Sequence, residues 1–533
     1  MKKRSFILVC LIFFLIPCLT RANQAAKSPK LTVIIVADQF AYHYIEKLKN
    51  HFRFGIKEFL DYGICYQNAY HAHGNPETTP GHNSLSTGTL PKDHGLSGNS
   101  WINEDGEKIR YTNPTQTMVD GLSDQFIMKS TNDIKHHVFS FSLKQRSAMG
   151  TANKLGKALW LDMKNGGFVS SKEYFDQLPG WLQKFNKEHD TRKLNHVTWN
   201  SMYPHNSAAY NFPYIRNYDH SALDYSLIEK KKIPINETQS NNNGYADLYF
   251  KVPHSSQLIF NAAKACLDHH IQENQHDKLI LWLLLSNLDF LCHYYGPDCF
   301  ETIDLIYHLD KQIYDFMKYV RTKIDDQDIV WVFSADHGIQ PIQEVVRKKG
   351  LKSARRIMAQ PLLEEMNKLV KEKFNIENIV LSFDSAYFFL DHKKLGIQDE
   401  KTQGAIFSVL KKYLLKQEGI RHVWTKQELK KAHFEPWEKE NFYKNQIYRN
   451  RIGDLICMPH PYCLITEYST GCSHNTPYDY DTHVPLMLLR KGEKHKIINQ
   501  KVWVTQLAAT LARLLNISRP SASTCDFLPG IFD

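Results

Sequence analysis

The sequence lacks several patterns that would place it in a common functional class. No two of its ten cysteines stand three residues apart, which argues against a cysteine-based zinc knuckle. Beyond residue 22, no apolar run is long enough to span a bilayer, so we expect no membrane span. The chain is mildly basic, with 66 Lys and Arg against 56 Asp and Glu, but its lysines are dispersed. This distribution gives no nucleic-acid footprint, and we expect no nucleic-acid partner.

A long apolar run does stand at the N-terminus. Met-Lys-Lys-Arg precedes an apolar stretch from Phe6 to about Leu19, and small residues follow at the positions that a signal peptidase reads. The pattern predicts a secretory signal peptide over residues 1–22 and an exported protein, periplasmic or secreted, over residues 23–533. A lipoprotein signal at Cys18 is disfavoured because no small residues precede it. The eight remaining cysteines permit disulfides in an oxidising compartment but do not fix their pairing.

Strands and helices alternate along the chain. Residues 31–37, 278–286 and 329–335 are apolar and rich in β-branched side chains, which predicts buried strands. Between the last two, apolar residues recur at spacings of three and four from Ile303 to Val320, which predicts an amphipathic helix. This rhythm predicts an α/β fold with a largely parallel sheet flanked by helices.

Two regions interrupt that rhythm. Residues 100–250 are rich in Asn, Tyr, His and Gly and predict an irregular insertion beside the site. Residues 346–450 predict a small α+β cap inserted into the core. Its expected elements are helices at 361–374 and 403–416, a strand or hairpin at 378–390 and a strand at 420–424.

Side chains suited to metal binding follow each of the three predicted strands. These are Asp38, Asp289 and the pair Asp336-His337. Because open α/β folds place their chemistry at the carboxyl edge of the sheet, we expect these side chains to meet there. The alternative for the Asp-His pair alone is a hydrogen-bonded loop pair with no ligand role.

Two further histidines extend this set. His293 follows Asp289 at i+4, so both lie on one face if the segment is helical, and His474 lies in a turn-rich loop. The alternatives are a helix ion pair for the first two and an ordinary loop histidine for the third. Three Asp and three His form two sets of nitrogen and oxygen ligands that suit zinc. Two metal ions about 3.5–4 Å apart can stabilise the attacking and leaving oxygens of an in-line displacement.

A nucleophile candidate stands in the stretch Glu-Thr-Thr-Pro-Gly-His over residues 77–82. A Thr at a helix start, with Pro in the first turn, places its hydroxyl where free backbone N–H groups point. A nearby metal would lower the pKa of that hydroxyl. The alternative is an ordinary N-cap, and the residues alone leave Thr78 and Thr79 in competition.

Together these motifs resemble the alkaline phosphatase superfamily, and within it the PafA-type periplasmic phosphomonoesterases. The resemblance covers most of the chain and follows, in order, Val-Ala-Asp38, Thr78-Thr-Pro-Gly-His82, Gly98-Asn99-Ser-Trp101, Asp289-x3-His293, Asp336-His337-Gly338, Gly453-Asp454 and His474 with Tyr480-Asp481-Thr-His483-Val-Pro485. It implies an alkaline-phosphatase-like fold and a chain that uses two zinc ions.

The resemblance also implies a role for each motif. Thr78 would be the nucleophile and Asn99 a ligand of the phosphate oxygens. One zinc would be held by Thr78 together with Asp38, Asp336 and His337, and the second by Asp289, His293 and His474. The family's His-Gly-Ser loop reads His-Asn-Thr here, so His483 is the reserve ligand for the second zinc.

The substrate class depends on Lys144 and Arg146, which follow a predicted strand at 138–142. Two residues apart on an extended chain, their side chains would point the same way. Two such cations suit a phosphoryl group with two ionised oxygens, although a solvated basic turn is the alternative. In the family that the chain resembles, a Lys-x-Arg pair after Ser-Leu contacts the monoester phosphate, and diesterase relatives lack it.

We therefore expect an alkaline phosphatase that hydrolyses small-molecule phosphate monoesters through a phosphothreonine intermediate. The runner-up is a nucleotide pyrophosphatase/phosphodiesterase on the same scaffold. A catalytically inactive binding protein is a third interpretation, against which the intact ligand set argues. No cysteine begins a Cys-x-Pro-x-Arg signature, which argues against a sulfatase. The sequence does not indicate an oligomeric state.

Overall fold

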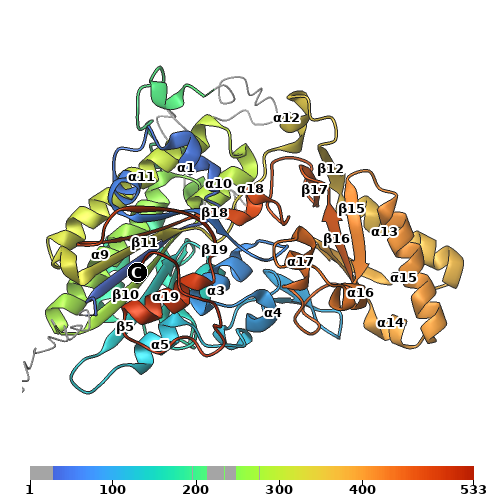
Figure 1. The fold of residues 1–533 in the computed structure, drawn as a ribbon, viewed down its shortest axis with the longest axis horizontal. Coiled ribbons are helices and arrows are strands. Elements are labelled where there is room, and N and C mark those ends of the chain that lie inside the picture. The colour runs from blue at the N-terminus through green and yellow to red at the C-terminus, as the bar shows by residue number, and fades with distance from the viewer. Residues whose placement is uncertain (1–27, 195, 213–232, 235–247, 275, 533) are drawn as a thin grey trace, which may run out of the picture.

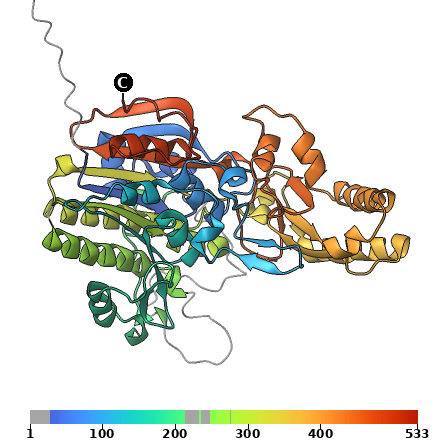
Figure 2. The same ribbon diagram turned by 90° about the horizontal axis from the view of Figure 1, so that it is seen from below.

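The computed structural model describes residues 28–194, 196–212, 233–234, 248–274 and 276–532. The predicted signal peptide, residues 1–22, lies outside this range. Figures 1 and 2 show a large body built on one sheet, with a smaller body of strands and helices beside it. Among the described residues, no helix combines the length and the apolar character needed to cross a membrane.

A nine-stranded sheet forms the core of the large body. Its order is β19-β2-β18-β11-β1-β10-β5-β6-β7. The strands are β1 (Leu31–Ala37), β2 (Ile64–Tyr70), β5 (His136–Ser142), β6 (Lys157–Asp162), β7 (Gly167–Val169), β10 (Lys278–Leu285), β11 (Ile329–Ser334), β18 (His483–Arg490) and β19 (Lys496–Trp503). The five adjacent strands β11, β1, β10, β5 and β6 run parallel to one another. Strand β18 is antiparallel to β11, and β7 is antiparallel to β6. The predicted fold class is confirmed.

Helices cover both faces of this sheet. Trp331 on β11 stacks edge-on against Phe316 of α11 (Phe300–Arg321), on one face. On β10, Trp282 points the opposite way and its indole N–H donates to Ser123 of α5 (Leu122–Met128). Because both faces are covered, the central strands are continuous hydrophobic runs instead of alternating ones.

The smaller body, which we call the cap, comprises residues 355–466. Its four-stranded sheet has the order β13-β14-β16-β15, built from β13 (Val380–Asp384), β14 (Tyr387–Leu390), β15 (Ile420–Thr425) and β16 (Leu455–Pro459). Helices α13 (Ala359–Phe374) and α15 (Glu400–Leu415) pack on it around a separate hydrophobic cluster. The predicted elements at 361–374, 378–390, 403–416 and 420–424 are all observed. However, β16 and β17 (Cys463–Thr466) lie beyond the predicted boundary at residue 450.

The prediction of an irregular insertion at residues 100–250 is wrong in part. Strands β5, β6 and β7 fall within it, yet they continue the central sheet. They lie toward its edge and carry polar residues, so their composition does not resemble that of the central strands. The short hairpin of β3 (Ser100–Ile102) and β4 (Lys108–Arg110) does stand outside the core sheet. All eight described cysteines are free.

Candidate active site

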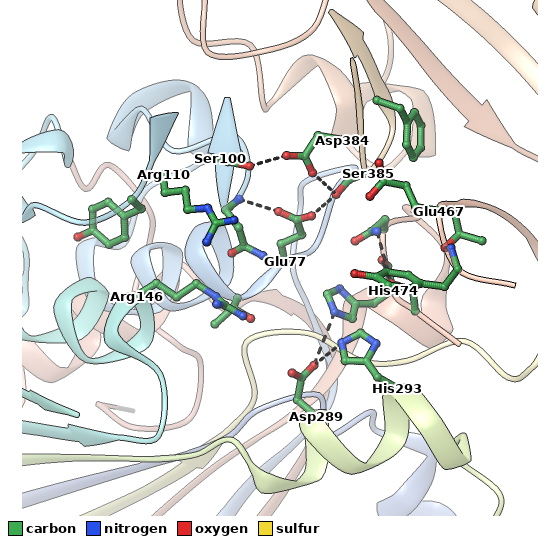
Figure 3. Close-up of a pocket in the computed structure, with 18 of the residues that line it drawn as sticks. Glu77, Ser100, Arg110, Arg146, Asp289, His293, Asp384, Ser385, Glu467 and His474 are labelled. Atoms are coloured by element: carbon green, nitrogen blue, oxygen red, sulfur yellow. Dashed lines mark hydrogen bonds and ion pairs between the residues drawn. The ribbon is translucent and has the colours of Figure 1, made fainter. Parts of the chain in front are cut away.

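The carboxyl ends of four neighbouring parallel strands bring the predicted residues together. Asp38 follows β1, Asp336 and His337 follow β11, and Lys144 follows β5. Strand β10 leads into α10 (Asn287–Tyr295), whose first turn carries Asp289. Figure 3 shows Asp289, His293 and His474 gathered at one side of the cavity above this edge. The meeting of these side chains at one sheet edge is therefore observed.

The first ligand group is fully buried. His337 Nε2 lies 3.5 Å from Asp38 Oδ1 and 3.4 Å from Asp336 Oδ2. Asp38 Oδ1 and His337 Nε2 have no hydrogen-bond partner among the described residues, whereas Asp336 Oδ2 lies 3.1 Å from His82 Nδ1. His337 Nδ1 lies 3.0 Å from the Gly338 carbonyl oxygen, to which it can donate, and this leaves the Nε2 lone pair free. Buried polar atoms without partners are costly, so their convergence fits a bound cation.

The second ligand group is centred on Asp289. Its Oδ1 lies 3.0 Å from His293 Nε2 and 3.6 Å from His474 Nε2. The Nδ1 atoms of these histidines lie 2.9 Å from the Cys472 carbonyl oxygen and 2.7 Å from that of Pro76. These contacts orient both Nε2 atoms toward Asp289, as the outer-shell partners of metal-ligating histidines do.

His483, the reserve ligand, lies elsewhere. Its ring stacks on those of Tyr42 and Tyr70, at centroid distances of 4.2 and 4.4 Å. Its Nε2 atom lies 2.7 Å from the Gln67 carbonyl oxygen. The structure thus groups His474, and not His483, with Asp289 and His293.

Burial of so many carboxylates shapes the electrostatics of the site. Burial, and then the neighbouring Asp336, raise the pKa of Asp38 to about 7. Burial would also raise the pKa of Asp289, but Lys144 and His293 outweigh it and hold that pKa well below its usual range. Burial lowers the pKa of His474, which favours the neutral ring that a metal requires. Two groups of carboxylate oxygens and imidazole nitrogens, each converging within one small volume, fit two metal ions.

Helix α3 (Thr78–Thr87) presents the nucleophile candidates. It begins after Glu77, and Pro80 lies in its first turn. A Cβ atom at Gly81 would lie 2.2 Å from the Asp336 carbonyl oxygen, so only glycine lets this helix approach the end of β11 so closely. The local sequence therefore fixes the start of α3 against the first ligand group.

Thr78 and Thr79 differ in their surroundings. The Thr79 backbone N–H and hydroxyl both donate to Asn99 Oδ1, at 3.0 and 2.8 Å. The Thr78 hydroxyl lies 3.4 Å from Lys144 Nζ, and Thr78 lines the cavity. Because the Thr79 hydroxyl is already bound, the geometry favours Thr78 as the reacting residue.

Lys144 and Arg146 both reach the site, but the extended geometry predicted for them is wrong. Lys144 caps α6 (Gln145–Ala152), so Arg146 belongs to the first helical turn. Lys144 Nζ lies 2.7 Å from Asp38 Oδ2 and 2.5 Å from Asp289 Oδ2. Arg146 lines the cavity, and its buried Nε has no hydrogen-bond partner among the described residues. The chain turns into a helix directly after Lys144, which the alternating pattern of β5 did not indicate.

Three neighbouring residues were given no role by sequence reasoning. Gln39 donates from Nε2 to Asp289 at 2.7 Å and from its backbone N–H to Asp336 at 3.1 Å. His82 Nδ1 lies 2.9 Å from the Thr78 carbonyl oxygen. Glu77 accepts a hydrogen bond from the Asn99 backbone N–H at 2.7 Å. All three stand next to or within the quoted motifs, and that adjacency was the available signal.

A cavity of about 540 Å³ opens beside Thr78 and the second ligand group, between the core and the cap. This volume is typical of small-molecule sites. Its walls come from the starts of α3 and α6, the hairpin β3–β4, the turn between β13 and β14 of the cap, and the loop 465–475 (Figure 3). The cavity is large enough for a small molecule, and Thr78 lies in its lining.

Comparison with known proteins agrees with this geometry. Residues 32–483 match the family described as type I phosphodiesterase / nucleotide pyrophosphatase. The alkaline phosphatase PafA of Elizabethkingia meningoseptica is 24% identical, over 94% of this chain and 94% of the relative. The alkaline phosphatase PhoV of Synechococcus elongatus is 25% identical, over 94% and 92%. A crystal structure of wild-type PafA superposes with a TM-score of 0.81 at 23% identity, covering 94% of this chain and 98% of that one.

The PafA likeness shows that the two proteins share a fold. The family match extends over most of the chain and includes every strand end described above. This chain belongs to the type I phosphodiesterase / nucleotide pyrophosphatase family.

Proposed function

We propose that this protein is a two-zinc alkaline phosphatase that hydrolyses small-molecule phosphate monoesters through a phosphothreonine at Thr78. The observation that carries the proposal is the convergence of two groups of metal-binding side chains, Asp289 with His293 and His474 and Asp38 with Asp289 and His337, beside a cavity that Thr78 lines. Two relatives that bear the name alkaline phosphatase support the same activity. The N-terminal pattern and the family likeness support export to the periplasm or the medium.

Each metal ion would take its ligands from one group. Thr78, Asp38, Asp336 and His337 would hold one zinc, and Asp289, His293 and His474 the other. When bound, zinc supplies Lewis-acid stabilisation of developing negative charge and lowers the pKa of a coordinated hydroxyl or water. The donor chemistry of mixed carboxylate and imidazole nitrogen suits zinc.

The chain's own residues then perform the displacement. The Thr78 oxygen attacks phosphorus, its bond to phosphorus forms, and the bond to the leaving oxygen breaks. Water next attacks the phosphothreonine, which releases phosphate and returns the Thr78 hydroxyl. Backbone N–H groups at the start of α3 favour the anionic phosphoryl oxygens.

Three side chains would bind the transferred phosphoryl group. Asn99 accepts from Thr79 through Oδ1, which leaves its Nδ2 group to donate to a phosphoryl oxygen. The guanidinium of Arg146 and the ammonium of Lys144 supply positive charge beside Thr78. Positioned cations of this kind stabilise the charge spread over the phosphoryl oxygens in the transition state.

A nucleotide pyrophosphatase/phosphodiesterase is the second candidate, because the matching family is described by that activity. The presence of Lys144 and Arg146 favours the monoesterase. A diester has one ionised oxygen at phosphorus, whereas a monoester has two, and two cations suit the second charge.

The test is metal analysis of the purified protein together with turnover of an aryl phosphate monoester and the matching diester. We expect two zinc ions per chain and a kcat/KM that favours the monoester. Preference for the diester would replace the proposal by the second candidate, and absence of turnover with either ester would refute both.

A further inference from the structure

The hairpin β3–β4 places two basic residues on the wall of the cavity. Lys108 and Arg110 stand two apart on β4, so their side chains point to the same side of the strand. Both line the cavity, whereas Ile109 between them packs on a hydrophobic cluster with Trp101. The alternation of β4 therefore directs its two cations toward the substrate space.

The two cations differ in what they contact. Lys108 Nζ lies 3.3 Å from Asp384 Oδ2 in the cap, and the same carboxylate oxygen accepts a 2.5 Å hydrogen bond from Ser100. For the Arg110 guanidinium, no ion pair or hydrogen bond is present within the described part of the chain. Arg110 thus offers the cavity a charge that the protein does not neutralise.

Arg110 and Arg146 come from different elements but enter the cavity from the same side. Figure 3 shows both guanidinium groups pointing inward from the side opposite His474 and Glu467. Arg146 belongs to the helix that follows Lys144, which contacts Thr78. Arg110 belongs to the hairpin, and among the described residues its side chain makes no hydrogen bond with Thr78. If Arg146 holds the transferred phosphoryl group, Arg110 on the same side of the cavity remains available to a further group of the same ester.

We propose that Arg110 forms a second anion subsite, which binds an acidic group on the leaving-group side of the ester. The proposal rests on the proposed function above and narrows its substrate class to phosphate monoesters that carry a further carboxylate or phosphate. A guanidinium matches both groups through paired N–H donors. Lys108 is paired with Asp384, so the unpaired charge of the subsite comes from Arg110.

The experiment compares two esters that differ in one group. Phosphoglycerate carries a carboxylate where glycerol phosphate carries a neutral hydroxymethyl group, and a propanediol bisphosphate tests a second phosphate against its monophosphate. We expect the wild type to prefer the acidic member of each pair. Arg110→Gln should reduce that preference about ten-fold, since a charged hydrogen bond is lost, and Arg110→Lys should restore part of it.

Arg53→Gln is the matched control, because Arg53 is exposed and lies outside the cavity. It should leave the preference unchanged. If Arg110→Gln lowered turnover of both members of a pair equally, the preference would be unchanged, and this result would overturn the subsite. If Arg110→Gln reduced the preference in only one pair, the subsite would be specific for the acidic group of that pair, either carboxylate or phosphate.

A binding measurement separates this proposal from the proposed function. Calorimetry on the Thr78→Ala protein, which cannot form the phosphothreonine, reports affinity without turnover. Tighter binding of phosphoglycerate than of glycerol phosphate, lost in Thr78→Ala/Arg110→Gln, would support the subsite even if the wild type hydrolysed neither ester. Equal affinities for the two would refute it, whatever the activity.

Discussion

The Ser385 hydroxyl donates a hydrogen bond to the Glu77 carboxylate, so the cap contacts the residue directly before Thr78. The other Glu77 oxygen accepts from the Asn99 backbone N–H at 2.7 Å. Asn99 in turn accepts from Thr79 on α3. One buried carboxylate therefore ties together the cap, the proposed phosphate ligand and the start of the nucleophile helix.

Loss of the hydrogen bond between Ser385 and Glu77 should lower activity without unfolding the protein. We expect Ser385→Ala to reduce kcat/KM for a phosphate monoester about ten-fold, because a buried carboxylate loses a donor and the position of Asn99 relaxes. Ser382→Ala is the control, since Ser382 lies on β13, the strand that ends directly before Ser385, and its hydroxyl has no partner within the described residues. Equal kinetics for the two variants would show that the contact is not needed.

Thr78 and Thr79 should respond differently to truncation. We expect Thr78→Ala to reduce turnover at least about 10³-fold, because the nucleophile is lost. Thr79→Ala should cost about ten-fold, since Asn99 keeps its bond to the Thr79 backbone N–H. Mass spectrometry of acid-quenched enzyme should find phosphate on Thr78. A larger loss in Thr79→Ala would reverse the assignment.

Removal of metal should abolish activity reversibly. Dialysis against a chelator should eliminate turnover, because Lys144 beside Asp38 and His82 beside Asp336 are the charged partners of these two carboxylates among the described residues, and neither supplies the Lewis acidity of a metal ion. Addition of zinc should restore turnover. Asp289→Asn should lower the zinc content from two ions to one, whereas exposed Asp315→Asn should not. Full activity after verified metal removal would contradict the two-zinc proposal.

The sequence was sufficient to predict the centre of the fold. Strands β1, β10 and β11 are fully buried runs, and hydrophobic continuity is a strong signal for central parallel strands. The ligands directly after those strands were predictable for the same reason. Strands β5 to β7 were placed in an insertion because they alternate polar and apolar residues or are short, and so lack that continuity.

Contacts between distant segments were beyond sequence reasoning. Glu77 and Ser385 stand 308 residues apart, and neither carries a pattern that pairs them. Lys144 was expected on an extended chain, but the helix α6 begins immediately after it and packs against α3, where Gly150 lies close to His82 and Asn83. Local periodicity predicts elements, whereas such packing decides which side chains meet.

A stability prediction concerns Asp310, a buried residue of α11 that belongs to neither ligand group. Its carboxylate accepts from the backbone N–H groups of Arg53, Phe54 and Ile56, at 2.9, 3.0 and 2.7 Å. Asp310→Ala leaves these donors at the start of α2 (Gly55–Tyr62) without an acceptor. We expect a loss of about 3 kcal/mol in unfolding free energy, measured as a lower urea midpoint. Asp315→Ala on the same helix should change it by less than about 0.5 kcal/mol.

Lys144 and Arg146 should decide which ester is cleaved. We expect Arg146→Ala to lower kcat/KM for an aryl monoester about 10²-fold and to affect the matching diester much less, because the diester lacks the second ionised oxygen. Lys144→Ala should also lower kcat/KM for the monoester more than for the diester. Its effect should include a disturbed metal site, since Lys144 lies 2.7 Å from Asp38 and 2.5 Å from Asp289. Zinc content measured in each variant separates the loss of a phosphate contact from a disturbed metal site. If both variants cleaved the monoester as the wild type does, with zinc retained, the two cations would have no role in substrate choice, and the diesterase would become the better assignment.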